Sequence, residues 1–273
     1  MNMQERIGRY WSARAAETSE FRVAELAGPS RKVWLEFIRS HLPDKDPKDI
    51  KALDCATGSG FYAFLLKDLG CDVTGVDYSD KMIEEALENN KKLHYPPIDF
   101  RQMDAQDMSF EDETFDFIIS RNMTWTVPDP GKVYSEWFRL LKPGGIVVNI
   151  DANYGYVFKL ADDTGWTEKQ NEKWGKDGKE MIGTRPDMIR ERNDISKELY
   201  IAKEDRPGWD LFTMLKCGFS EVRAETDIYG KLFPEFAAMT KNHGAGDKLE
   251  FPEDAPDTRI FCVSGVKSGE GEN

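Results

Sequence analysis

The fold is decided by Lys51-Ala52-Leu53-Asp54-Cys55-Ala56-Thr57-Gly58-Ser59-Gly60, which runs directly into Phe61-Tyr62-Ala63-Phe64-Leu65-Leu66. This pattern predicts a short strand, a tight turn and the first turns of a buried helix. Gly58 and Gly60 lack a Cβ, so the turn can adopt positive φ and a ligand can approach its backbone. The helix that follows directs free N–H groups at the same spot. Asp54 adds a carboxylate, which suits a ligand with ammonium and sulfonium groups better than a pyrophosphate.

Strands and helices alternate outward from that stretch. We expect strands at Lys51–Cys55, Asp72–Val76, Ile98–Met103, Phe115–Ser120 and Ile146–Ile150, with helices near Phe61–Leu69, Asp80–Asn90 and Val133–Leu141. Lys142-Pro143-Gly144-Gly145 is expected to stop the last of these helices. A sixth strand is expected to begin around Gly218–Ala224 and reach about Tyr229, and a last, antiparallel strand is expected at Thr258–Val266. This alternation predicts an α/β fold with a doubly wound, mainly parallel seven-stranded sheet.

The chain divides into a core and additions. We expect an N-terminal helical arm at 1–45, the core at 46–152 and 209–267, an inserted helical cap at 153–208, and a disordered tail at 268–273. The aromatic residues of the insert are Tyr154, Tyr156, Trp166 and Trp174. They favour a cap that covers the substrate. The alternative is a solvent-exposed helical insertion that has no role in function. A second insertion at 230–257 has the apolar anchors Phe233, Phe236 and Met239.

Composition narrows the class of partners. The net charge of −13 argues against nucleic acid. No apolar stretch approaches the roughly 20 residues that span a bilayer, and the N-terminus lacks the apolar core of a signal peptide. The four cysteines form no Cys-x-x-Cys pair and the three histidines lie far apart, so we expect reduced thiols in a cytoplasmic protein and no metal site. The oligomeric state is left open between monomer and homodimer.

Acidic residues follow three of the expected strands. Asp54, Asp77 and Asp104 end the first, second and third strands, and the carboxyl ends of parallel strands form the ligand-binding edge of such a sheet. Gly58-x-Gly60-x-x-Ala63 with Asp77 also satisfies a dinucleotide fingerprint, which would indicate an NAD-dependent reductase. The charge of Asp54 beside a pyrophosphate, and the additional Asp104, argue against that alternative.

The segment from Lys51 to Gly145 resembles class I S-adenosylmethionine-dependent methyltransferases of the small-molecule type, similar to methyltransferase types 11 and 25. A weaker resemblance to the same family is found in Gly218–Val222. The resemblance implies a Rossmann-like fold. It is carried by Asp54–Gly60, Asp77–Met82, Asp104-Ala105, Phe115–Ile119 and Leu140–Gly145. The sequence departs from the family pattern at Ala56, where the family commonly has glycine.

The resemblance implies roles for these residues toward the methyl donor, S-adenosylmethionine, whose product is S-adenosylhomocysteine. Asp77 would accept hydrogen bonds from both ribose hydroxyls. Asp54 would face the cationic methionine end, and Asp104 with the following amide would read the adenine edge. Tyr78 and Met82 would flank the adenine, although Met82 is also explained as helix core. The implied donor-binding residues are Asp54, Ala56, Thr57, Gly58, Gly60, Asp77, Tyr78, Met82, Asp104, Ala105, Asn122, Tyr10 and Trp11.

The acceptor side is less determined. The family places the donor methyl and the acceptor just after the fourth strand, here at Ser120–Thr126. Asn122 would orient a nucleophile or bind the methionine end, and Trp125 would either wall the acceptor site or be core beneath the cap. Tyr10, with Trp11 and Arg14, resembles an arm that closes over the donor; packing on the cap is the alternative. Asn122, Trp125 and Tyr10 are therefore the catalytic candidates, and a base is required only if the acceptor must lose a proton first.

The sequence thus predicts an enzyme that moves a methyl group from S-adenosylmethionine to a small molecule by in-line displacement. The acceptor atom (O, N, S or C) is open. The alternatives are a non-catalytic donor-binding regulatory protein, an RNA or protein methyltransferase, and the NAD-dependent reductase.

Overall fold

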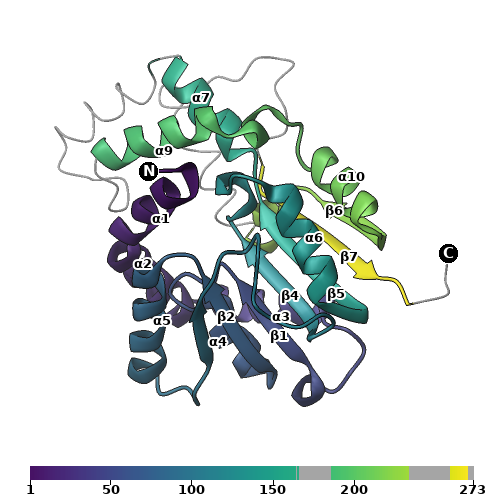
Figure 1. The fold of residues 1–273 in the computed structure, drawn as a ribbon. Coiled ribbons are helices and arrows are strands. Elements are labelled where there is room, and N and C mark those ends of the chain that lie inside the picture. Colours follow the sequence, from purple (N-terminus) through teal and green to yellow (C-terminus); the bar gives the residue numbers. More distant parts are fainter. Residues whose placement is uncertain (164, 166–185, 234–258, 270–273) are drawn as a thin grey trace.

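Seven strands form one sheet in the computed structural model, which describes residues 1–163, 165, 186–233 and 259–269 (Figure 1). The strand order is β3-β2-β1-β4-β5-β7-β6. The strands are β1 (Lys51–Cys55), β2 (Asp72–Asp77), β3 (Asp99–Gln102), β4 (Phe115–Arg121), β5 (Leu141–Asp151), β6 (Phe219–Glu225) and β7 (Phe261–Lys267).

The first five strands are parallel, and β7 runs antiparallel to both of its neighbours, β5 and β6. Both the doubly wound α/β fold class and the antiparallel last strand are therefore confirmed. β1 lies at the centre, with Lys51 opposite Asp72 of β2 and Ala52 opposite Phe117 of β4. The order of connection reverses between β1 and β4, so the switch point of the sheet lies at the carboxyl end of β1.

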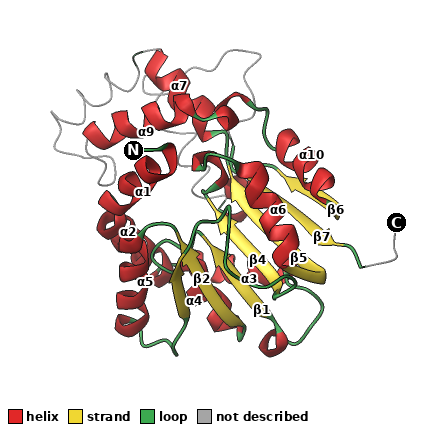
Figure 2. Cartoon of the chain, in the orientation of Figure 1, coloured by secondary structure: helices red, strands yellow, loops and turns green. Residues whose placement is uncertain are grey.

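Helices cover both faces of the sheet (Figure 2). Successive residues of β1 point to opposite faces: Ala52 packs with α3 (Ser30–His41) and α4 (Phe61–Leu69), whereas Leu53 packs with α6 (Pro130–Leu140) and α10 (Gly208–Cys217). Trp34 of α3 and Trp137 of α6 are fully buried, one in each layer. This double burial explains why Ala52 and Leu53, which point to opposite faces, are both apolar.

Helices α1 (Met3–Ala13), α7 (Tyr154–Asp163) and α9 (Pro186–Glu198) lie over the carboxyl ends of the parallel strands (Figure 1). The other helices are α2 (Ala15–Ala27), α11 (Ile228–Leu232) and α5 (Asp80–Lys92), which packs beside β2 and β3. Short 3-10 turns lie at Pro47–Asp49, Thr124–Thr126 and Tyr200–Lys203.

The N-terminal helix α1 and the inserted helix α9 pack against each other. Arg6 of α1 bonds Glu191 at 2.7 Å and Glu198 at 2.6 Å, and Ile7 packs beside Ile195. The described part of the inserted segment thus consists mainly of α7, α9 and a 3-10 turn, and its role as a cap stays a prediction. Trp166, Trp174, Phe236, Met239, Thr258 and residues 270–273 lie outside the described residues.

Several expected boundaries were wrong, among them the start of the last strand, which lies at Phe261. β6 ends at Glu225 instead of about Tyr229, because Asp227, at φ 56°, begins α11 and its side chain accepts from the Gly230 N–H at 3.2 Å. The segment Lys142–Gly145 lies within β5 and is not the turn that ends α6. Leu141 already pairs with Phe115, and a register shift between Phe115 and Phe117 accommodates Gly144 at φ 77°.

Candidate active site

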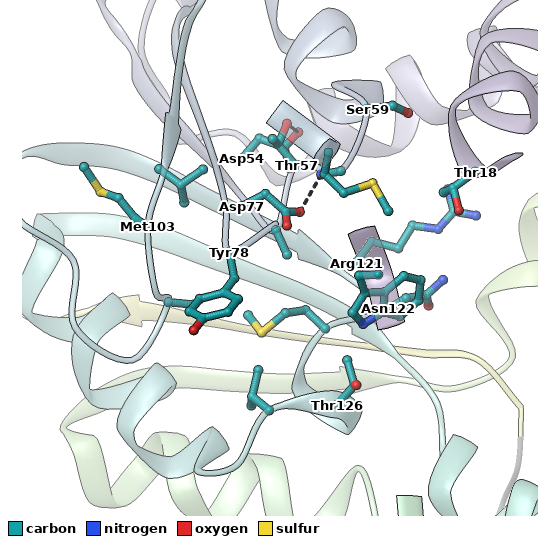
Figure 3. Close-up of a pocket in the computed structure, with 18 of the residues that line it drawn as sticks. Thr18, Asp54, Thr57, Ser59, Asp77, Tyr78, Met103, Arg121, Asn122 and Thr126 are labelled. Atoms are coloured by element: carbon teal, nitrogen blue, oxygen red, sulfur yellow. Dashed lines mark hydrogen bonds between the residues drawn. The ribbon is translucent and has the colours of Figure 1, made fainter. Parts of the chain in front are cut away.

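A cavity lies at the carboxyl ends of β1, β2 and β4, where α1 and α2 form part of its wall. Most of the residues predicted from the sequence line it: Asp54, Ala56, Thr57, Gly58, Asp77, Tyr78, Met82, Asp104, Ala105, Asn122 and Trp11. Gly60, Tyr10 and Trp125 are not part of its lining. In Figure 3, Met103 lies at one side of the cavity and Thr18 and Arg121 at the other, with Asp77 between them.

The Asp54 carboxylate braces the glycine turn. Its Oδ2 accepts from the Thr57 hydroxyl at 2.6 Å and from the Ala63 N–H at 2.8 Å, which ties the strand end to the first turn of α4. The residue is only 1% exposed, and burial raises the pKa of its carboxyl to about 7. Asp54 therefore has a structural role in the turn. That its carboxylate also faces the cationic end of a ligand stays a prediction.

Two residues of the turn have left-handed backbone conformations. Gly60 has φ 95°, and a Cβ there would lie 2.8 Å from the Phe64 ring, so glycine is required by the turn even though it does not line the cavity. Ala56 has φ 60°, a region that favours glycine. This conformation gives a physical reason why glycine is common at this position in the family that the sequence resembles.

Asp77 presents its carboxylate to the middle of the cavity. Its Oδ2 accepts from the Gly58 N–H at 2.9 Å (Figure 3), and its Oδ1 accepts from the Ser79 N–H at 2.9 Å. A carboxylate has about four acceptor positions, so each oxygen retains capacity for one more donor. Burial raises the pKa of this carboxyl to about 6. The arrangement fits a ligand with two adjacent hydroxyl donors.

Asp104, the acidic residue that follows β3, forms another part of the cavity wall. Asp104 Oδ1 accepts from the Gln106 N–H at 2.9 Å, which fixes the turn that places Ala105 on the cavity. Met82 is 3% exposed and lines the cavity from α5, so it serves both as helix core and as cavity wall. Tyr78 packs closely on α1, since a Cβ at Gly8 would lie 2.6 Å from its ring.

Asn122 is the catalytic candidate that reaches the cavity. It has φ 56°, and its N–H donates to the Ile150 carbonyl at 2.8 Å. Its Oδ1 accepts from the Tyr154 hydroxyl at 3.2 Å. Asn122 is therefore held from both its backbone and its side chain.

The other two candidates are packed behind the wall. Trp125 is 5% exposed, its Nε1 donates to the Asn122 carbonyl at 3.0 Å, and its ring lies among those of Trp11, Tyr154 and Phe158. Tyr10 packs with residues of α9, and its hydroxyl accepts from Arg14 at 2.8 Å. Their placement matches the core and cap-packing alternatives of the sequence analysis.

Sequence reasoning missed a buried polar network beneath the Asn122 loop. The Arg206 guanidinium, 1% exposed, bonds both oxygens of Asp210 at 2.8 and 2.9 Å and the Thr124 hydroxyl at 2.6 Å. Asp151 accepts from the same hydroxyl at 2.5 Å and from the Trp125 N–H at 3.0 Å. This network fixes the loop that carries Asn122.

The lining residues that sequence reasoning did not assign include two cations and several residues of the N-terminal helices. Arg22 and Arg121 line the cavity, together with Gln4, Ile7 and Thr18 from the N-terminal helices. A signal was present for Arg121, which stands directly before Asn122 at the end of an apolar strand. No comparable signal marked Arg22 or Arg206, since both lie in polar segments.

The raised pKa of Asp77 predicts pH-dependent ligand binding. Hydroxyl donors require the ionised carboxylate, so affinity for the donor or its demethylated product should fall about tenfold between pH 7 and pH 5. The stability of the ligand-free protein should depend on pH in the opposite direction. Folding raises the pKa values of Asp54 and Asp77, so the folded state holds protons more tightly than the unfolded chain. Their contribution to stability is therefore present at low pH and is lost as pH rises toward 7.

Calorimetric titrations across this range test the prediction, with circular dichroism to confirm that the protein is folded at each pH. Asp77→Asn should remove the part of the profile centred near pH 6. A wild-type affinity that is flat across this range would contradict the assignment of Asp77.

Comparison with known proteins agrees with the fold. Residues 53–149 match the family model described as a methyltransferase domain. A phosphatidylethanolamine N-methyltransferase of Cereibacter sphaeroides is 39% identical over 80 residues, which are 29% of this chain and 39% of the relative. A ubiquinone/menaquinone biosynthesis C-methyltransferase of Desulfotalea psychrophila is 37% identical over 120 residues, 43% of this chain and 47% of the relative. The chain thus spans about half or less of these curated relatives.

Among solved structures, the chain is similar to phosphoethanolamine N-methyltransferase 2 of Haemonchus contortus, in complex with phosphomonomethylethanolamine and S-adenosylhomocysteine. The TM-score is 0.63 at 19% identity, over 98% of this chain and 61% of that one. At this identity the similarity establishes the fold alone. Within the described residues, no helix is long and apolar enough to cross a membrane.

Proposed function

We propose that this chain, whose residues 53–149 match the model of a methyltransferase-domain family, is an S-adenosylmethionine-dependent methyltransferase that acts on a small molecule. The observation that carries the proposal is the cavity itself. Asp54, Asp77 and Asp104, from three adjacent strand ends, line one space at the switch point of the sheet. Their carboxylates suit a ligand that carries hydroxyl donors and positive charge, and disfavour a pyrophosphate.

The residues present fit the donor. Asp77 retains two acceptor positions for the ribose hydroxyls, and Asp104 with Ala105 would border the adenine. When bound, S-adenosylmethionine supplies a methyl group on a sulfonium sulfur, which leaves as a neutral thioether once a nucleophile takes the methyl. Asn122, fixed by Ile150 and Tyr154, would align the acceptor with that group.

The acceptor is proposed to be a small molecule because the cavity is roofed by α1 and α2 and the chain carries net charge −13. The names of the relatives point to two acceptor types, the amine of phosphatidylethanolamine and a carbon atom in ubiquinone and menaquinone biosynthesis. The location is proposed to be the cytoplasm, which the four unpaired cysteines support.

Methyl transfer from isotope-labelled S-adenosylmethionine tests the activity. The full chain should transfer label to at least one member of a panel of small amines, phosphoamines and quinols. Asn122→Ala should lower the rate strongly and leave donor affinity nearly unchanged if Asn122 aligns the acceptor. A folded protein that binds the donor but labels no member of the panel would favour the non-catalytic alternative.

A further inference from the structure

The cavity lining carries charges of both signs. Asp54 and Asp77 line it beside the glycine turn, whereas Arg121 lies at one side of the cavity (Figure 3) and Arg22 joins the lining from α2. The proposed donor accounts for the carboxylates, because its ribose and cationic methionine portion suit them. It leaves the two arginines to be explained.

Arg121 is a rigidly held cation. Its guanidinium lies among four aromatic rings, with its carbon 4.9 Å from the centre of the Trp34 ring and 5.8 Å from that of Tyr62. Its Nη2 donates to the Tyr229 hydroxyl, and its Nη1 lies 3.4 Å from Glu25 Oε1. The side chain is 8% exposed. A guanidinium fixed in this way is already oriented for a partner, so little side-chain entropy would be lost on binding.

The charges in this cluster do not balance. Glu25 bonds Arg22 and lies near Arg121, so one carboxylate faces two guanidinium groups and one positive charge is left over. Both arginines line the cavity, whereas Glu25 does not. Burial, and then the charge of Arg121, lower the pKa of Arg22, as expected where cations gather with too little counter-charge.

Two buried polar atoms of this cluster lack a hydrogen-bond partner within the part of the chain that the structure describes. Among the described residues, the Arg121 Nε and the Tyr62 hydroxyl are both buried without a hydrogen bond. Both residues line the cavity. Buried donors are almost always satisfied in folded proteins, so two orphaned donors beside an excess positive charge indicate a missing acceptor. An oxyanion would supply both the acceptor atoms and the charge.

We propose that Arg22, Arg121 and Tyr62 bind an oxyanion, a carboxylate or a phosphate, carried by the acceptor molecule. The inference rests on the proposed function and narrows its substrate class to acceptors that carry an anionic group away from the methylated atom. Such a molecule would bridge the cavity, with its anion at the arginines and its nucleophile toward Asn122. A neutral quinone would leave the arginines without a partner. The donor's own methionine carboxylate is the other source of an oxyanion, and the experiment separates the two.

The test uses the full chain saturated with S-adenosylhomocysteine, and calorimetry as the readout. Two matched pairs are titrated: phosphoethanolamine against ethanolamine, and β-alanine against propylamine. At least one anionic member should bind about tenfold or more tightly than its twin. Equal binding within both pairs, or no binding of either anionic member, would overturn the inference. If S-adenosylhomocysteine itself fails to bind the folded protein, it is the proposed function that fails.

Three variants locate the site. Arg121→Met should weaken the anionic ligand about tenfold or more, whereas Arg121→Lys should recover part of the loss because it keeps the charge. Glu25→Gln keeps the size of the side chain but removes the counter-charge, so it should tighten anion binding several-fold. Affinity for S-adenosylhomocysteine should stay unchanged in Arg121→Met. A loss there would assign the arginines to the donor's carboxylate and contradict the proposal.

Discussion

Replacing Arg206 with methionine should cost about 3–5 kcal/mol of the free energy of unfolding. Arg206 is 1% exposed and bonds Asp210 at 2.8 and 2.9 Å, with its Nη1 3.3 Å from Asp151. Removing the guanidinium leaves two fully buried carboxylates without their cation. Burial already raises the pKa of Asp151 against the opposing effect of Arg206, so Asp151 should take up a proton more readily in the variant.

Urea unfolding measures this loss, and an exposed arginine serves as the control. Arg101 bonds Asp99 at 2.6 Å, but both side chains are about half exposed, so Arg101→Met should change the free energy of unfolding by about 1 kcal/mol or less. If both variants lost similar amounts, the buried network would not hold the structure as described. Because Arg206 also bonds Thr124, the first variant should lose activity at temperatures where it is still folded.

The Asp77→Ala variant should bind S-adenosylhomocysteine about 1.5–3 kcal/mol more weakly than the wild type, the range for lost charge-assisted hydrogen bonds. The Asp77 carboxylate lines the cavity, and both of its oxygens are held in place by backbone N–H groups, those of Gly58 and Ser79. Its loss removes the acceptor for two hydroxyls and also frees the N–H of the glycine turn.

The control for this variant lies on the same strand. Asp72 begins β2 at the opposite edge of the sheet and is exposed, so Asp72→Ala should leave the affinity unchanged. Asp77→Asn keeps the size and one acceptor oxygen, and it should fall between the wild type and Asp77→Ala. Unchanged affinity in Asp77→Ala would mean that the ribose is held elsewhere.

The core could be predicted from the sequence because its signals are local. β1 and α4 were expected at Lys51–Cys55 and Phe61–Leu69, and both have these bounds in the structure. An apolar run ended by Asp and a glycine turn is a short-range pattern that the neighbouring chain does not alter. The acidic strand ends could be grouped for the same reason, since parallel strands bring their carboxyl ends together.

The rest depended on long-range contacts that one sequence does not reveal. Arg206 bonds Thr124 across 82 residues, and Arg121 lies near Glu25 across 96. Nothing in the polar segment around Arg206 distinguishes it from the exposed charges beside it. The end of β6 was missed for another reason: Ile228 and Tyr229 are apolar and suit a strand, but Asp227 in the left-handed region begins a helix instead.

Calorimetric titration of the full chain with S-adenosylhomocysteine measures whether the cavity binds the methyl donor's product. We expect one site per chain with a dissociation constant of about 1 μM or lower, on the order of −8 kcal/mol, and no binding of NADH under the same conditions. Absence of binding heat at several temperatures, from a protein that circular dichroism shows to be folded, would contradict the assignment of this cavity to the methyl donor.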